Sequence, residues 1–352
     1  MRDTVSIEVQ LFQLIVYIPT FSLGLLFNVS ALWILLFKIR KWTESTTYMG
    51  NLIFNDCLLL FSLPFKMSAY NTKKPWGLGR PFCLFLESLY FVNMYGSILI
   101  IMCISVDRYI AVRHPFLAKS LRSPLKATLV CAAVWTIIFG SSVEAYKLHD
   151  VHFNGTHCFH SFSNRTWQKV HLVAIMETLF VASALIMTLC SIEIVRVIKR
   201  IRRDSLEVQK QSNNKSVKIV LANLFTFLIC FIPYHIALLL YFLVKHGTIP
   251  SDYREPLRSF VQVSLCLTNV NCMLDGICYY LILKENWKST REVTEATESS
   301  SLKAPIRSLR VAHLVKARQR GVHGESLSQE STILHPGYAK PLVFTGDSGG
   351  SF

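Results

Sequence analysis

The stretch from Pro81 to Val112, PFCLFLESLYFVNMYGSILIIMCISVDRYIAV, decides the fold class. Residues 88–106 within it carry no charged side chain. An uncharged apolar run of about 20 residues is long enough to cross the hydrocarbon core of a bilayer as a helix. This stretch therefore predicts a transmembrane helix.

Six further apolar blocks of similar length occur along the chain of 352 residues. The seven predicted spans are residues 11–37, 46–70, 81–112, 127–143, 167–195, 219–244 and 259–283. Only 17% of the residues are charged, against roughly one quarter in a typical soluble domain. Because a helix satisfies its own backbone hydrogen bonds in lipid, the sequence predicts an all-α membrane protein, a seven-transmembrane helix bundle.

Lysine and arginine set the predicted orientation of the bundle. The formal net charge is +15, and the basic residues gather beside the apolar blocks. Residues 196–218, between the fifth and sixth spans, are rich in Lys and Arg and contain only two acids, Asp204 and Glu207. Because such loops remain in the cytoplasm, the N-terminus is expected outside the cell and the C-terminus inside. The basic charge therefore indicates membrane loops rather than a nucleic-acid partner.

This topology divides the chain into three regions. Residues 1–10 are expected to form an extracellular N-terminus, and they lack the pattern of a removable signal peptide. Residues 11–287 are expected to form the seven-helix domain, with a short cytoplasmic helix at its end. Residues 288–352 are rich in Ser, Thr, Gly and charge and have little apolar periodicity, so they are expected to form a disordered cytoplasmic tail.

Two cysteines face the outer side in this topology, while the other eight lie inside the spans. Cys83 stands at the outer end of the third span and Cys158 in the second outer loop, so they are the predicted disulfide pair. The alternative, two free thiols, is disfavoured outside the cell. Asn154 and Asn164 each begin an Asn-X-Thr sequence in the same loop and are predicted glycosylation sites.

Several motifs together resemble the rhodopsin-like G-protein-coupled receptors over about residues 15–287. They are Asp107-Arg108-Tyr109, with Cys83 twenty-five residues before its arginine, Asn28 in the first span, the run Asn51 to Asp56, and Trp135. The resemblance implies a plasma-membrane receptor, and no enzyme, that signals to heterotrimeric G-proteins by conformational change. It further implies that arrestin and receptor kinases act on the Ser/Thr-rich tail.

The same resemblance assigns residues to activation and G-protein coupling. They are Asp107, Arg108 and Tyr109 in the third span, Phe231 and Pro233 in the sixth, and Tyr279 in the seventh. Arg108 beside Asp107 is expected to form an ion pair in the resting state and release it in the active one. Many family members add a restraining acid at the start of the sixth span, but here the region reads Asn213-Asn214-Lys215, so this second restraint is expected to be missing.

The resemblance also implies an allosteric sodium ion inside the bundle, which is the one cofactor expected. The residues that map onto that site are Asp56, Asn93, Ser97, Asn271 and Asp275. All five offer side-chain oxygen, which suits a hard cation, and an intramembrane carboxylate is costly unless it is paired or hydrated. The alternative is a proton shared between Asp56 and Asp275, without sodium.

Two opposite charges in the outer half of the bundle indicate a ligand pocket. Lys66 in the second span and Glu87 in the third lie at similar depth, and we expect them to form a partly buried pair at the pocket floor. Tyr70, Tyr90 and Phe91 are expected to line its walls. For these aromatic residues the alternative is plain packing.

Four runs resemble members of the family that respond to lysophosphatidylinositol. These runs are Ile18–Phe21, Leu63–Met67, Tyr90–Ser97 and Asn269–Cys272. This resemblance implies a lysophospholipid agonist, with Lys66, Arg254 and Arg258 as donors to its anionic headgroup. Leu121–Pro124 is shared also with kynurenate-responsive relatives, so a small anionic metabolite or a nucleotide stays an alternative. A seven-span transporter or channel is the alternative from a different class, although the chain shows no internal repeat.

Overall fold

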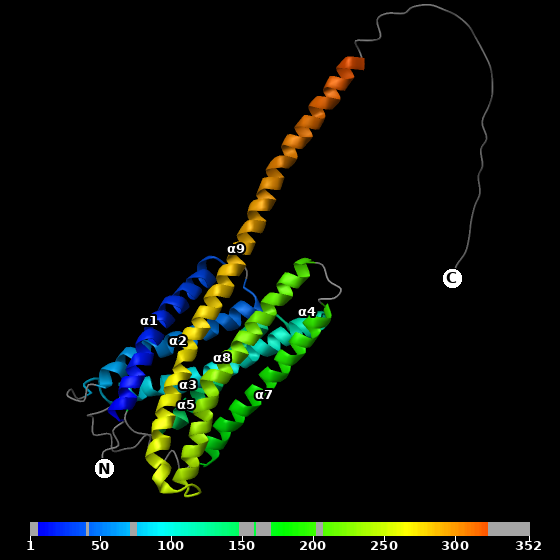
Figure 1. The fold of residues 1–352 in the computed structure, drawn as a ribbon. Helices are drawn as coiled ribbons and strands as arrows, with labels where there is room; N and C mark the ends of the chain where they lie inside the picture. Colours follow the sequence, from blue (N-terminus) through cyan, green and yellow to red (C-terminus); the bar gives the residue numbers. More distant parts are fainter. Residues whose placement is uncertain are drawn as a thin grey trace, which may run out of the picture. The chain divides into compact units, whose positions relative to one another are not determined.

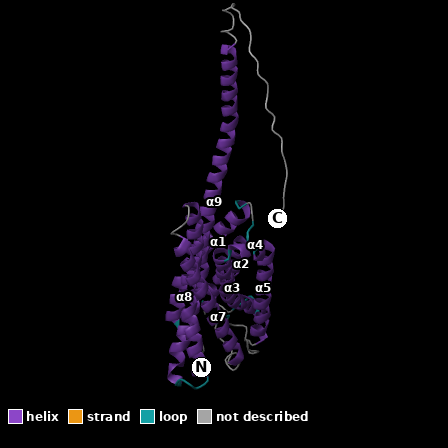
Figure 2. Cartoon of the chain, turned by 90° about the vertical axis from the view of Figure 1, so that its right-hand side faces the viewer, coloured by secondary structure: helices purple, strands orange, loops and turns teal. Residues whose placement is uncertain are grey.

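The computed structural model describes residues 6–39, 42–70, 76–147, 158–159, 170–201 and 207–322. Within these residues every regular element is helical and none is a strand (Figure 2). Seven of the helices are long and apolar enough to cross a membrane, and they overlap all seven predicted spans. The predicted fold class is therefore confirmed.

The chain divides into two compact units, residues 1–290 and 291–352, and the first unit contains the helix bundle. The elements are α1 (Ile7–Phe37), α2 (Glu44–Ala69), α3 (Arg80–Arg113), α4 (Pro115–Leu121), α5 (Pro124–Lys147), α7 (Val170–Ile201), α8 (Glu207–Lys245), the 3₁₀ helix η1 (Ser251–Tyr253) and α9 (Arg254–Val322). Figure 1 shows the long helices of the first unit side by side, with the start of α1 and the short helix α4 at opposite ends of the bundle. This placement agrees with an outer N-terminus and a cytoplasmic loop between α3 and α5.

Three helix boundaries differ from the expected ones. Helix α1 begins at Ile7 rather than residue 11, because the Ser6 side chain caps it by accepting a hydrogen bond from the Val9 N–H. Helix α8 begins at Glu207 rather than residue 219. Helix α9 continues to Val322, whereas the sequence predicts a disordered chain from residue 288.

The composition of residues 288–322 explains the longer helix. The segment is rich in Ala, Leu, Lys, Arg and Glu, it contains one proline, and its single glycine stands next to its last residue. These are strong helix formers, so the segment has helical propensity without an apolar face that the hydropathy pattern would reveal. The remaining residues of the predicted tail, 323–352, lie outside the described residues.

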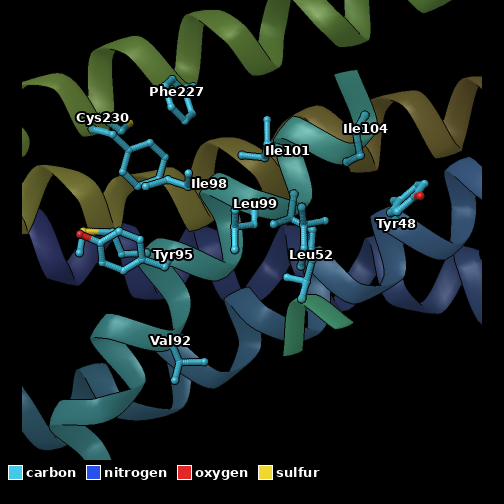
Figure 3. Close-up of a cluster of buried hydrophobic side chains, with 14 of the residues drawn as sticks. Tyr48, Leu52, Val92, Tyr95, Ile98, Leu99, Ile101, Ile104, Phe227 and Cys230 are labelled. Atoms are coloured by element: carbon cyan, nitrogen blue, oxygen red, sulfur yellow. The ribbon is translucent and has the colours of Figure 1, made fainter. Parts of the chain in front are cut away.

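Helix α3 is the most buried of the seven spans and forms the centre of the bundle. Figure 3 shows its Ile98 and Ile101 packed with Leu52 of α2 and Phe227 of α8 in one apolar cluster. Helices α2 and α3 approach closely at Gly96, where an added Cβ would lie 2.7 Å from the Asn55 amide oxygen. A larger residue at this position would separate the two helices that carry most of the candidate site.

The predicted disulfide between Cys83 and Cys158 is confirmed, with 5.8 Å between the Cα atoms. It ties residues 158–159 of the second outer loop to the outer end of α3. The predicted glycosylation sites Asn154 and Asn164 belong to the same loop and lie outside the described residues.

Candidate functional site

Lys66 is the centre of the outer half of the site. It lies in α2 two residues after Pro64, and its side chain is only 5% exposed. Its Nζ atom lies 4.6 Å from the ring centroid of Tyr90, 5.5 Å from that of Phe159 and 5.7 Å from that of Tyr17. A cation over a desolvated aromatic face gains roughly 2 kcal/mol. These three rings form the Lys66 cage, which holds the ammonium group in place.

Glu87 positions the loop that closes this cage. Its Oε1 atom accepts a 2.8 Å hydrogen bond from the backbone N–H of Phe159. Phe159 has a φ of 67°, in the left-handed region that non-glycine residues rarely adopt. The neighbouring disulfide at Cys158 and the Glu87 hydrogen bond together hold this conformation.

The structure corrects the expected pairing of Lys66 with Glu87. Among the described residues, no ion pair of 4.0 Å or less joins the two side chains. Glu87 acts on Lys66 only as a more distant charge, while its carboxylate binds the loop. Sequence reasoning placed the two charges at one depth, but the side-chain directions separate them.

Polar side chains from α1, α2 and α9 complete the wall beside the cage. The Tyr70 hydroxyl donates to Gln13 Oε1 at 2.5 Å, and Gln13 Nε2 donates to the Gln262 carbonyl at 3.0 Å. Asn269 Nδ2 donates to the Tyr17 hydroxyl at 3.2 Å.

The other predicted ligand residues lie outside the cage. The Phe91 ring packs against Tyr95 with 4.7 Å between centroids, in the cluster around α3 and α8 rather than the one around Lys66. Arg254 is exposed at the start of α9, and Arg258 Nη1 lies 3.9 Å from Glu255 Oε2 in the same helix. Sequence reasoning missed Tyr17, Gln13 and Phe159, because no local motif marks them as neighbours of Lys66.

At the cytoplasmic end, the carboxylate of Asp107 binds two arginines. Arg108 reaches it through Nη2 at 2.5 Å and Nε at 3.1 Å, and Arg108 also donates to Ser45. Arg122, which follows α4, donates to both carboxylate oxygens at 2.7 and 3.1 Å. The predicted Asp107–Arg108 pair is thus present, but Arg122 was not expected to share the acid.

Arg122 also reaches a second acid. Its Nη2 atom lies 3.2 Å from Oε2 of Glu44 at the start of α2. Burial lowers the pKa of the Arg122 guanidinium, but the hydrogen bonds and charge of Asp107, with the charge of Glu44, raise it above its ordinary value. Arg122 therefore stays charged and connects the cytoplasmic ends of α2 and α3 with the loop between α3 and α5.

The remaining residues assigned to activation lie in buried or partly buried contacts. Tyr279 of α9 donates to Asn223 Oδ1 of α8 at 3.0 Å. The Phe231 ring lies 5.4 Å from that of Phe227, and Phe231 stands two residues before Pro233, where the backbone hydrogen bonding of α8 is interrupted. The Tyr109 hydroxyl lies 3.5 Å from His114 Nε2.

A buried polar cluster occupies the middle of the bundle. Asp56 is fully buried, and Oδ1 accepts from Asn93 Nδ2 at 3.1 Å. Asn271 Nδ2 donates to Asp275 Oδ2 at 2.7 Å, while Ser97 Oγ accepts from Asn55 Nδ2 at 3.1 Å. Hydrogen bonds therefore join Asp56 and Asn93 with Ser97 through Asn55, and they join Asn271 with Asp275 in a second group. The two groups interact through the charges of Asp56 and Asp275.

Several oxygens of this cluster have no hydrogen-bond donor. Asp56 Oδ2 and Asn271 Oδ1 are buried without a partner, as are the amide oxygens of Asn28 and Asn55. An unsatisfied buried acceptor costs about 1–3 kcal/mol. Two carboxylates surrounded by unsatisfied oxygens form a donor set that fits a small hard cation.

Comparison with known proteins supports the seven-helix fold. Residues 27–296 match the profile of the seven-transmembrane receptor family named for rhodopsin. The chain is 35% identical to mouse G-protein coupled receptor 55 over 80% of its own length and 89% of the relative's. It is 35% identical to chicken lysophosphatidic acid receptor 6, covering 77% and 90% of the two chains. It is also 35% identical to mouse G-protein coupled receptor 35, covering 78% and 86%.

Proposed function

The chain belongs to the rhodopsin family of seven-transmembrane receptors, and we propose that its agonist is a lysophospholipid such as lysophosphatidylinositol. As a member of that family it is a multi-pass protein of the plasma membrane. The Lys66 cage is the observation that carries the ligand class. It holds a buried ammonium group that makes no ion pair among the described residues, and it supplies the positive charge that a phosphate requires.

The surroundings of Lys66 suit an amphiphile. Leu59, Leu60 and Leu63 of α2 form the buried apolar cluster next to the cage, together with Tyr17 and Tyr90. Val16, Phe21 and Met67 pack against this cluster and are only partly buried, so an acyl chain gains burial against them that a small polar metabolite does not. Two of the relatives named for their ligand, the chicken and mouse lysophosphatidic acid receptors 6, are named for a lysophospholipid.

Signal transfer would proceed from the cage through the bundle to a heterotrimeric G-protein. The agonist shifts the equilibrium only if it binds the active arrangement more tightly than the resting one. At the cytoplasmic end the change would release Arg108 from Asp107, which is half of the arginine network described above. The Ser/Thr-rich residues near the C-terminus supply acceptor sites for receptor kinases and, once phosphorylated, for arrestin.

The buried polar cluster would hold a sodium ion as an allosteric ligand. Asp56, Asn93, Ser97, Asn271 and Asp275 supply its oxygen donors. When bound, the ion would offset the negative charge of the two carboxylates. The neutral alternative, a proton shared between Asp56 and Asp275, predicts no dependence on the identity of the cation.

The experiment is agonist-stimulated nucleotide exchange on G-proteins in membranes that contain the receptor. The exchange rates with lysophosphatidylinositol, lysophosphatidic acid, kynurenate and a nucleoside diphosphate are compared at matched surface expression. The proposal expects exchange with at least one lysophospholipid and none in membranes lacking the receptor. A response to kynurenate or to the nucleotide alone would assign the other ligand class, and solute or ion flux without exchange would indicate a transporter or channel.

A further inference from the structure

A second buried polar centre lies between α3, α7 and α8. His235 of α8 is 2% exposed, and its Nδ1 atom lies 3.3 Å from Glu177 Oε1 of α7. The imidazole stacks on the Phe180 ring with 3.9 Å between centroids and 7° between planes. Tyr95 of α3 meets it edge-on, with 6.2 Å between centroids. Neither Glu177 nor His235 belongs to the Lys66 cage or to the buried polar cluster around Asp56.

Two polar atoms of this centre lack hydrogen-bond partners. His235 Nε2 and the Tyr95 hydroxyl oxygen are both buried with none. Each unsatisfied group costs about 1–3 kcal/mol, so two at one site indicate that an additional group binds there. Glu177 occupies the Nδ1 side of the ring, so Nε2 is the ring nitrogen that is left for an additional group.

The chemistry of the two atoms selects the group. Nε2 accepts or donates according to which ring nitrogens carry a proton, and the phenol of Tyr95 can donate or accept. An alcohol hydroxyl satisfies both. It can donate to one atom and accept from the other, whereas an anionic phosphate or carboxylate would be repelled by Glu177.

The position of this centre fits a ligand that also reaches Lys66. Tyr90, which contacts Lys66, and Tyr95 are five residues apart on α3, which is about 7.5 Å along the helix axis. Phe91 packs on Tyr95 and occupies the same helix between them. Five residues also turn about 140° around the helix, so a headgroup whose phosphate binds Lys66 must extend both along and across α3 to reach the second centre.

We propose that Glu177, His235 and Tyr95 form a subsite for a headgroup hydroxyl of the agonist. This inference rests on the proposed function and makes it more specific. In this proposal Lys66 binds the phosphate. Side chains of α7 and α8, which contribute no ring to the cage, distinguish one headgroup from another. His235 stands two residues after Pro233, so a ligand bound to His235 would contact α8 next to the point where its backbone hydrogen bonding is interrupted.

The test compares two lipids with the same acyl chain. The headgroup of lysophosphatidylinositol carries a ring of hydroxyls, whereas that of lysophosphatidic acid is a bare phosphate. The variants are Tyr95→Phe and His235→Phe, which keep the rings and their stacking but remove the hydroxyl or the imidazole nitrogens. Each should weaken lysophosphatidylinositol about tenfold in nucleotide exchange and change lysophosphatidic acid less than about threefold.

Control variants separate recognition from packing. Phe180→Leu removes the ring stacked on His235 but no hydrogen bond, so it should shift both lipids to the same extent. The subsite would be overturned if Tyr95→Phe and His235→Phe lowered the potency of both lipids equally, or of neither. In that case a response of the wild-type receptor to a lysophospholipid would still support the proposed function. If the wild-type receptor responded to neither lipid, both the proposed function and the subsite would be overturned.

Discussion

The two ends of the bundle treat their buried cations differently. At the cytoplasmic end, Arg108 and Arg122 share one carboxylate at distances of 2.5–3.1 Å. At the outer end, Lys66 lies over three aromatic rings and makes no ion pair within the described part of the chain. The inner charges are therefore satisfied by the protein itself, and the outer charge is satisfied only in part.

This difference separates a switch from a binding site. Because Asp107 is also paired with Arg122, Arg108 can leave it and return without leaving the carboxylate unpaired, which suits a reversible transition. A caged ammonium group pays its desolvation whether or not a ligand is present, so an arriving anion gains most of the attraction. Predictions that disturb one end and spare the other test this separation.

The largest effect is expected from the disulfide, which belongs to the outer end alone. Cys83→Ser and Cys158→Ser should each abolish the agonist response, because Phe159 then loses the tether that holds it over Lys66. Losing such a bond typically costs about 2–5 kcal/mol. The measurement is agonist-stimulated exchange per receptor at the surface, with Cys278→Ser as the control. Normal signalling by either variant would contradict the account.

A tenfold effect is expected from the polar cluster that lies between the two ends. Asp56→Asn should remove the dependence of agonist affinity on sodium, which is typically about tenfold for coupled sites. Agonist binding is measured in sodium and in a bulky organic cation at equal ionic strength. If the wild-type affinities already agree in the two media, the cluster binds no sodium.

A smaller effect is expected from the shared acid at the cytoplasmic end. Asp107→Asn frees both arginines and should raise agonist-independent exchange about fivefold, since a charge-assisted contact contributes roughly 1.5–3 kcal/mol, part of which water replaces. Agonist affinity at the outer end should change little. Basal exchange at or below the wild-type level would show that Asp107 does not restrain the resting state.

The smallest effects are expected from Arg122 and Glu44, the more exposed residues of the cytoplasmic network. Arg122→Gln should raise basal exchange about twofold to threefold and Glu44→Gln less than twofold, because partly exposed ion pairs contribute roughly 0–1 kcal/mol. Arg113→Gln, an exposed basic residue at the end of α3, is the matched control. An effect of Glu44→Gln larger than that of Asp107→Asn would reverse the order that the distances predict.

The spans and the disulfide could be predicted from the sequence, because each depends on hydropathy or on the compartment that a cysteine faces. Lys66 and Asp107 were also recognisable as ionisable residues beside or within apolar runs. Their partners were not. Tyr17 and Phe159 meet Lys66 from helix α1 and from an outer loop, and Arg122 meets Asp107 across α4. Such contacts depend on how the helices pack and on side-chain direction, which hydropathy does not encode.

The predicted pairing of Lys66 with Glu87 was wrong for the same reason, because the sequence does not determine side-chain direction. Two opposite charges at one depth are an ordinary signal for an ion pair, yet the Glu87 carboxylate binds the Phe159 backbone. Depth in the membrane follows from the position in a helix, but the rotation of a side chain about that helix depends on its neighbours.

The central claim is that Lys66 holds the anionic part of the agonist, and Lys66→Met tests it most directly. Methionine keeps the length of the apolar stem and removes the charge, while Lys66→Arg keeps the charge with a different shape. Lys245→Met, which removes another lysine that lies over a tyrosine ring, is the control.

The measurement is the potency of lysophosphatidylinositol in nucleotide exchange, corrected for receptor at the surface. Loss of a charge-assisted contact of roughly 1.5–3 kcal/mol predicts a potency about tenfold to a hundredfold lower for Lys66→Met, an intermediate value for Lys66→Arg and little change for Lys245→Met. Unchanged potency in Lys66→Met would mean that the phosphate binds elsewhere, and the account of the outer end would be wrong.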